Sequence, residues 1–159
     1  MSSVIMNENE LRAALQAEYL HLQKVIEDFD GRALTIKAWS ITFSLAAVGG
    51  AFASRAPGMF LVSCVSALLF WFIEAHWKAF QYAYHERSGQ IEAYFRGERA
   101  LDAAFQIGSS WFRAWRTEGP GTLGRVMLWP HVALPHAAVA VIALALFVLA
   151  STGSVQLRE

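Results

Sequence analysis

The sequence is poor in the residues that build a disulfide framework, a metal cluster or a charged surface. Its one cysteine, Cys64, lies in an apolar stretch, which excludes an internal disulfide and a cysteine-based zinc cluster. Charged residues make up 16% of the chain, against about 25% in an average soluble domain. The 13 basic and 13 acidic residues balance, and nucleic-acid binding would need a concentrated basic face. We therefore expect no metal, no cofactor and no nucleic-acid partner.

The chain also lacks the signatures of secretion and catalysis. A cleaved signal peptide has a basic start and an apolar core, whereas Glu8, Glu10 and Glu18 lie in the first 20 residues. We expect the mature protein to begin where the sequence does. There is no glycine-rich phosphate loop, no nucleophile elbow and no histidine pair at zinc-binding helical spacing. These absences predict that the protein is not an enzyme.

Long apolar segments are what the chain does contain, with 55% hydrophobic residues. A helix of about 20 apolar residues, rising 1.5 Å per residue, crosses a hydrocarbon core of about 30 Å. Three segments meet this length, at residues 33–54, about 58–77 and about 131–151. Proline and glycine in residues 55–58 predict a tight turn between the first two. The fold class is therefore all-α, an integral membrane bundle of three transmembrane helices.

The segments outside the spans read as long amphipathic helices. In residues 8–30 the apolar residues recur at helical spacing, with a cap at Asn7 or Asn9 and an end at Asp30–Gly31. The stripe consists of Leu15, Tyr19, Leu22, Ile26 and Phe29. Two interpretations stay open: the helix packs on its own chain, or it forms a heptad seam between subunits.

The second span is expected to continue past Lys78 as an amphipathic helix whose stripe reaches Leu101 and Phe105, with a bend at Gly89 or Gly97. Residues 106–130 form a connector that contains a Gly119-Pro-Gly turn. Its aromatic cluster, with Arg113 and Arg116 nearby, suits the headgroup level of a membrane. The aromatic residues of the cluster are Trp111, Phe112 and Trp115.

The predicted organisation has four parts. These are a cytoplasmic helix at 1–31, a transmembrane hairpin at 32–78, a cytoplasmic extension and connector at 79–130, and the third span with its tail at 131–159.

The distribution of basic residues predicts an orientation. Three basic residues precede the first span, Arg55 alone lies in the turn, six arginines lie between the second and third spans, and the tail holds Arg158. Basic loops stay in the cytoplasm. We therefore predict a bacterial inner-membrane protein with a cytoplasmic N-terminus and an external C-terminus.

Three ionisable residues lie at one depth inside the predicted spans. Lys37, Glu74 and His136 are each four or five residues from a cytoplasmic end, which is ~6–8 Å at 1.5 Å per residue. Intramembrane ionisable groups tend to pair, so we predict that these three side chains meet in one polar layer. In the alternative interpretation Lys37 extends to the interface and Glu74 marks the membrane exit.

Small residues recur every fourth position on the first span, at Thr42, Ala46, Gly50 and Ser54. Other small residues lie beside this row, namely Ser40, Ser44, Ala47 and Ala51. Such faces let helices approach closely. They would pack within the protomer, pack neighbouring subunits, or line a pore.

The hairpin and the helix that follows, over residues 32–105, resemble the SLATT family of small bacterial membrane proteins. The resemblance is architectural and is carried by ALTIKAWSITFSLAAVGGAF and YHERSGQIEAYF. It implies a pore-forming effector in a nucleotide-signal or conflict system. The third span is a departure from the simplest two-span members. The chain resembles, more loosely, the small membrane accessory proteins of some CRISPR systems.

The size of the chain narrows its possible functions further, because three membrane spans are too few to enclose a transport pathway alone. We expect a homo-oligomeric membrane assembly that acts as a pore or as a membrane-disrupting effector. The alternative is a membrane anchor or scaffold whose cytoplasmic helices bind a cytosolic partner protein.

Overall fold

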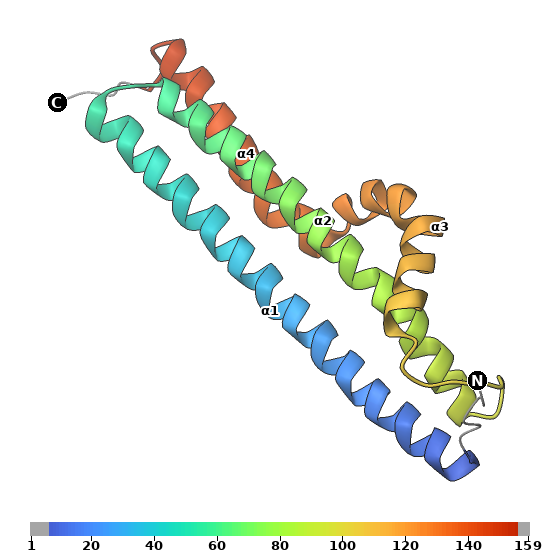
Figure 1. The fold of residues 1–159 in the computed structure, drawn as a ribbon. Coiled ribbons are helices and arrows are strands. Elements are labelled where there is room, and N and C mark those ends of the chain that lie inside the picture. The colour runs from blue at the N-terminus through green and yellow to red at the C-terminus, as the bar shows by residue number, and fades with distance from the viewer. Residues whose placement is uncertain (1–6, 156–159) are drawn as a thin grey trace. The chain divides into compact units, whose positions relative to one another are not determined.

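The computed structural model describes residues 7–155, apart from the side chains of residues 118–120. The chain order is α1 (Glu8–Ser54), α2 (Gly58–Phe95), α3 (Ile107–Met127) and α4 (Pro130–Ser151), as Figure 1 shows. No strand occurs in the described part of the chain. The prediction of an all-α fold is confirmed.

Three of these helices, α1, α2 and α4, are long and apolar enough to cross a membrane. The predicted turn between the first two is also present. α1 ends at Ser54 and α2 begins at Gly58, and the residue after α1, Arg55, has a positive φ of 54°. The apolar segments and the turn therefore lie where the sequence placed them.

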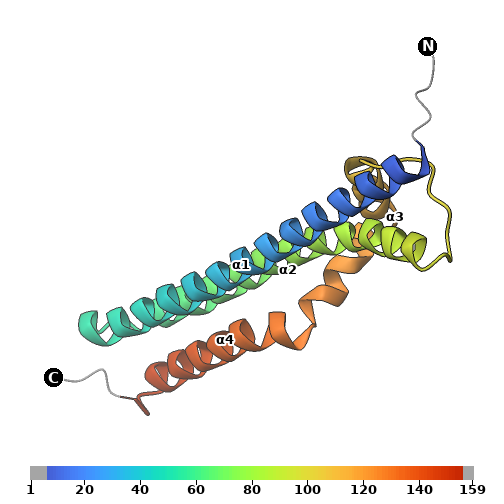
Figure 2. The same cartoon turned by 90° about the horizontal axis from the view of Figure 1, so that it is seen from below.

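The chain divides into two compact units. The first contains Met1–Asp30 and Ala79–Thr122, and the second contains Gly31–Lys78 and Leu123–Glu159. Within each unit α1 and α2 run antiparallel and side by side (Figures 1 and 2). α3 packs on α2 in the first unit, and α4 completes the second.

The first unit is built on the apolar stripe of α1. Leu15 and Leu22 are buried in a cluster with Ile91 of α2 and Ala104 of the α2–α3 connection. The predicted stripe is confirmed, and the helix packs on its own chain, as one of the two interpretations expected. At its start, Asn7 and Glu10 form a reciprocal capping box, with Glu10 N donating to Asn7 Oδ1 at 2.9 Å.

The predicted helix end at Asp30–Gly31 is wrong, because α1 continues through it to Ser54. One glycine inside a helix costs only about 1 kcal/mol relative to alanine. The helix ladder continues on both sides, and the hydroxyl of Thr35 donates to the carbonyl of Gly31 at 3.1 Å. A single glycine without a proline is therefore a weak stop.

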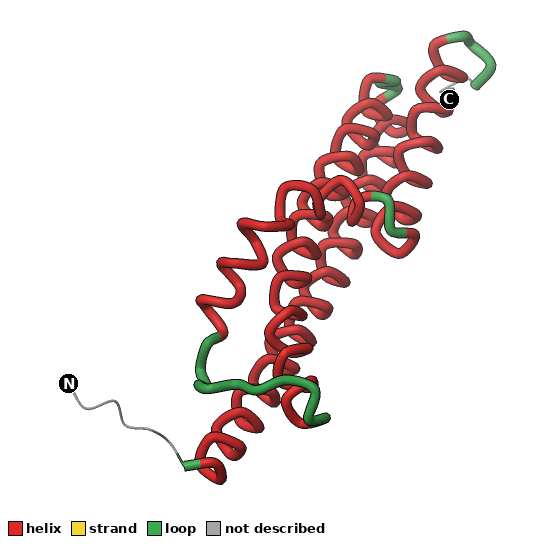
Figure 3. The backbone as a smooth tube through the Cα atoms, turned by 90° about the vertical axis from the view of Figure 1, so that its right-hand side faces the viewer, coloured by secondary structure: helices red, strands yellow, loops and turns green. Residues whose placement is uncertain are grey.

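α2 ends at Phe95, so the prediction that its helix reaches Leu101 and Phe105 is also wrong. Gly97 has φ +76°, its N–H donates to Tyr94 O, and the N–H of Glu98 donates to Ala93 O. This is the Schellman pattern that ends helices at a left-handed glycine. The chain then crosses to α3 as the long loop in Figure 3. α2 runs through Gly89 without a break.

The connector predicted for residues 106–130 is mostly the helix α3, which passes through the Gly119-Pro-Gly segment where a turn was predicted. Packing on both sides of this segment explains why the helix continues, since Trp111 and Trp115 precede it and the buried Val126 follows it. Trp111 and Trp115 stack with rings 5.9 Å apart, and Trp111 Nε1 donates to Phe80 O of α2 at 3.1 Å. Of the aromatic cluster assigned to the headgroup level, only Phe112 is exposed.

Two glycines near the end of α2 give a matched test of this account. A Cβ added to Gly97 or to Gly89 would meet no atom within 4 Å, so backbone conformation alone decides the effect. Gly97→Ala should destabilise the protein by about 1–2 kcal/mol, because its φ is left-handed. Gly89→Ala should stabilise it by up to about 1 kcal/mol. Thermal unfolding of both variants in detergent measures the difference; equal effects would contradict the assigned helix end.

Candidate functional site

The structure brings Lys37, Glu74 and His136 together in the second unit. They come from α1, α2 and α4, the three helices with long apolar segments. Lys37 Nζ forms an ion pair with Glu74 Oε1. Glu74 Oε2 lies 2.9 Å from His136 Nε2. Glu74 therefore links all three helices through its two oxygens.

Ser40 extends this chain of contacts. Its Oγ lies 2.9 Å from His136 Nδ1. Glu74 and Ser40 are 0% exposed and His136 is 1% exposed, whereas the side chain of Lys37 keeps 18% exposure. The four residues form a polar chain, Lys37–Glu74–His136–Ser40, that reaches the surface of the unit only at its lysine end. We call it the polar chain below.

For an ionised Glu74 and a neutral His136, the chemistry of the groups sets the direction of these hydrogen bonds. A carboxylate only accepts, so His136 Nε2 carries the proton and donates to Glu74. In the neutral imidazole, Nδ1 is then the acceptor, and Ser40 donates to it. All the donors of the polar chain therefore point towards the Glu74 carboxylate.

The polar chain adds little net free energy of folding, but removing one of its members would strongly destabilise the second unit. A buried ion pair roughly balances its Coulomb gain against desolvation, but losing one partner costs about 3–5 kcal/mol. Around it the helices meet through small residues, including Ala47 and Ala51 of α1, Ala67 of α2 and Ala140 of α4, all buried. Small side chains bring the helix axes close enough for these polar groups to meet.

A serine, a histidine and a carboxylate in series also occur in nucleophilic hydrolases. Here the serine has no exposed surface, so a substrate does not reach its Oγ in this conformation. Helix linkage and proton exchange along the polar chain fit the closed packing better than hydrolysis does.

The sequence did not single out Ser40 as part of this site, although it lies three residues after Lys37 on one helical face. The next inward turn of α1 carries Ser44, whose carbonyl accepts from Ser63 Oγ at 3.2 Å. Among the described residues, Ser44 Oγ is buried and has no hydrogen-bond partner. The polar face of α1 thus extends one turn beyond the polar chain.

A second buried ion pair, in the first unit, was missed altogether. Glu18 is 1% exposed and Arg87 is 3% exposed. Arg87 Nε and Nη2 each lie 2.9 Å from a different Glu18 oxygen, a bidentate geometry. The sequence did contain a sign of this ion pair, because the charged Glu18 lies between Leu15 and Leu22 on the apolar stripe of the helix.

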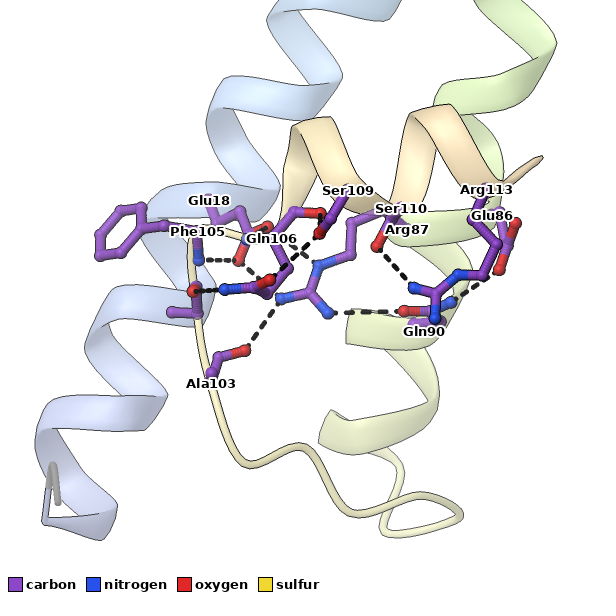
Figure 4. A network of polar contacts seen from close by, with 11 residues as sticks. Glu18, Glu86, Arg87, Gln90, Ala103, Phe105, Gln106, Ser109, Ser110 and Arg113 are labelled. Atoms are coloured by element: carbon purple, nitrogen blue, oxygen red, sulfur yellow. Dashed lines mark hydrogen bonds and ion pairs between the residues drawn. The ribbon is translucent and has the colours of Figure 1, made fainter. Parts of the chain in front are cut away.

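Glu18 and Arg87 also hold the α2–α3 loop, as Figure 4 shows. The backbone N–H groups of Phe105 and Gln106 donate to Glu18 at 2.7 and 3.1 Å. Arg87 Nη2 donates to the carbonyl of Ala103 at 3.1 Å. The buried charges therefore satisfy loop groups that have no helical partner.

A second set of polar contacts joins α1 to α2, beginning at Tyr19, the residue after Glu18. Tyr19 donates to Glu92 at 3.1 Å, and Gln23 donates to Ser88 at 3.0 Å. The hydrogen bond to Glu92 is the main cause that raises the pKa of the Tyr19 phenol above its usual range. This contact favours the neutral phenol, so its contribution to stability is lost only as the pH rises through that raised pKa.

The predicted small-residue row does not pack inside the protomer. Thr42, Ala46 and Ser54 are exposed, and Gly50 is half-buried near Met59. The row beside it is inside, since Ser40, Ser44, Ala47 and Ala51 are buried. Packing within the protomer is therefore wrong for Thr42, Ala46 and Ser54. A four-residue repeat advances 40° per step around a helix of 3.6 residues per turn, so the four residues spread over about 120° of the helix surface.

Comparison of the chain with protein-family models, with curated proteins and with solved structures found no match. The sites described above are therefore the basis for function.

The polar chain predicts strong coupling between Lys37 and Glu74. Lys37→Met leaves the buried carboxylate without its cation, and Glu74→Gln leaves the cation without its carboxylate. Each should cost about 3 kcal/mol or more. The double variant should cost clearly less than the sum, with a coupling of about 1–3 kcal/mol. Unfolding free energies in detergent measure this cycle.

Lys24 supplies the control for that cycle, because it is an exposed lysine on the same helix. Lys24→Met should change stability by no more than about 0.5 kcal/mol. Additive effects of the Lys37 and Glu74 substitutions would show that the two charges do not interact.

The second ion pair predicts a local effect on the loop. Arg87→Met leaves Glu18 buried without its counter-charge, and should destabilise the first unit by about 3–5 kcal/mol. Hydrogen exchange at the amides of Phe105 and Gln106 should speed up. Arg12→Met, at an exposed arginine of α1, should leave both amides unchanged. Unchanged exchange in the Arg87 variant would mean that the pair does not hold the loop.

Proposed function

We propose that the protein is a homo-oligomeric membrane protein of three transmembrane helices, and that its assembly forms a pore. The second unit presents bulky apolar side chains outwards, among them Leu69 of α2 and Ile142 of α4. Water would solvate such a surface poorly, whereas lipid tails accommodate it.

The boundary of the membrane would fall near the ends of the second unit. The guanidinium of Arg32 lies 5.5 Å from the ring of Trp77, and basic and aromatic residues gather at membrane interfaces. Lys37 lies five residues further along α1 than Arg32, on the apolar side of this level. With the basic residues counted above, this supports a bacterial inner-membrane protein with the N-terminus in the cytoplasm and the C-terminus outside.

The main support for an oligomer is the composition of the outward face of α1. At 100° per residue, the positions opposite the buried serines and alanines are all small and exposed. They are Gly31, Thr35, Ala38, Thr42, Ala46, Gly49 and Ala53. Bulky exposed residues flank them on both sides, Leu45 on one and Phe43 on the other. We call this seven-residue face the outer row.

The outward faces of α2 and α4 differ from the outer row. On α2 the exposed residues include Leu61, Val65 and Leu68, and on α4 they include Leu134 and Val141. Without a hydrophobic driving force inside a membrane, helices associate through small residues that allow close packing. α1 is therefore the helix suited to meet other copies of the chain, while α2 and α4 suit lipid.

The pore follows from the composition of the same face. Thr35 and Thr42 give the outer row hydroxyl groups, and its glycines and alanines leave space beside them. Several copies of α1 around one axis would surround a narrow, weakly polar path that one chain cannot enclose. The architectural resemblance to SLATT proteins, which implies a pore-forming effector, agrees with this proposal.

A scaffold function is the second candidate, and it too has a specific observation in its favour. Phe105 is 68% exposed and Phe112 is 55% exposed, both in the first unit. These side chains would offer apolar contacts to a cytosolic partner protein.

The test places bulk on the outer row. Thr42→Leu and Gly49→Leu should shift the detergent-solubilised particle from an oligomer towards a monomer, with association weakened at least tenfold. The same variants should lose dye release from liposomes. Mass photometry and a fluorescence leak assay measure the two effects.

Ala145→Leu is the control, since it adds three carbons at an exposed position of α4 and should leave association and leak unchanged. A monomeric wild-type particle would overturn the oligomer. An oligomer that releases no dye but co-purifies with a cytosolic protein would favour the scaffold.

A further inference from the structure

The first unit contains a hollow of about 310 Å³ between α2 and α3. Alanines create it, because Ala79 and Ala83 of α2 and Ala114 of α3 line it with side chains that end at Cβ. The volume lies at the lower end of the range for small-molecule pockets. It suits a compact ligand of a few functional groups.

Aromatic rings form the walls of the hollow. Tyr82 lines it from α2 and Trp115 from α3. Trp115 is held in place by its stack on Trp111 and by the ring of Phe80, 4.6 Å away. Its ring is therefore positioned before any ligand arrives.

One charged side chain lines the hollow, the carboxylate of Glu86. Glu86 is exposed, and Gln90 Nε2 donates to its Oε1 at 2.9 Å. Among the described residues Glu86 has no ion-pair partner within 4 Å. The Arg113 side chain is drawn next to Glu86 in Figure 4, and its Nη2 donates to Ser110 Oγ at 3.4 Å. Two further titratable groups line the hollow, the phenol of Tyr82 and the imidazole of His85, and a neutral imidazole also accepts a hydrogen bond.

We propose that this hollow is a binding site for an organic ammonium group on a short apolar body. Aromatic faces attract ammonium groups through their quadrupoles, and an unpaired carboxylate supplies the opposite charge. The alanine floor leaves room for the apolar part of the ligand. An anion of the same size would be repelled by Glu86. The site is separate from the proposed pore and does not depend on oligomer formation.

Two sources supply such a group. One is a soluble amine. The other is the ethanolamine headgroup of a phospholipid, which becomes available if the proposed membrane arrangement holds, because Ala79 lies two residues after Trp77, where the predicted second span ends. Both present the same ammonium chemistry to Glu86, Tyr82 and Trp115.

Calorimetric titration of the full chain, in nanodiscs of phosphatidylglycerol alone, tests the site. The probe is 2-phenylethylamine, and 2-phenylethanol is its uncharged counterpart of the same shape. The amine should bind saturably and at least tenfold more tightly than the alcohol. Glu86→Gln should remove that preference, and Ala83→Leu should abolish binding of both by filling the hollow.

Glu27→Gln is the matched control, because Glu27 is an exposed carboxylate of the same unit that does not line the hollow. It should leave amine binding unchanged. Equal affinity for amine and alcohol, no effect of Glu86→Gln, or no saturable binding would each overturn the proposal. In nanodiscs that contain phosphatidylethanolamine, weaker apparent binding of the amine identifies the headgroup as a ligand; unchanged binding identifies a soluble amine.

Discussion

A carboxylate that has lost all contact with water must find its hydrogen-bond donors in the protein, and this requirement organises the second unit. Glu74 receives a lysine from α1 and an imidazole from α4, so its desolvation is compensated only when three helices are in register. Many of the apolar contacts in this unit are made by alanines, beside larger side chains such as Phe60 and Val132, and alanines specify register weakly. The polar contacts supply the specificity that those alanines lack.

The first unit meets the same requirement in a different way. There the buried charges are a glutamate and an arginine, and their remaining capacity is taken up by backbone groups of a loop. In the second unit the partners of Glu74 are all side chains of helices, so the Lys37–Glu74 pair stabilises the packing of those helices. In the first, the pair secures a connection that forms no regular structure. The hollow beside α3 lies in this more polar unit, where carboxylates such as Glu86 can remain exposed and unpaired.

Much of the fold could be predicted because the sequence patterns that specify it extend over many residues. Segments of about 20 apolar residues and the proline–glycine turn after Arg55 each depend on several residues that agree. The misplaced boundaries depended on single residues. Gly31 continues a helix and Gly97 ends one, and the difference lies in a φ angle that the sequence alone does not reveal. The polar layer at Lys37, Glu74 and His136 could be predicted from depth alone. Ser40 and the Glu18–Arg87 pair could not, because a polar residue on an apolar stripe has a clear meaning only once its distant partner is known.

The Glu18–Arg87 pair joins residues 69 positions apart, and this separation has a consequence for the order of synthesis. The first thirty residues carry leucines and a glutamate that become buried only against residues 79–122. While the ribosome makes the intervening hairpin, that N-terminal helix has no partner for its apolar face or its charge. Contacts of such long sequence separation form late. The apolar face and the carboxylate of the N-terminal helix therefore stay exposed during synthesis until residues 79–122 have been made.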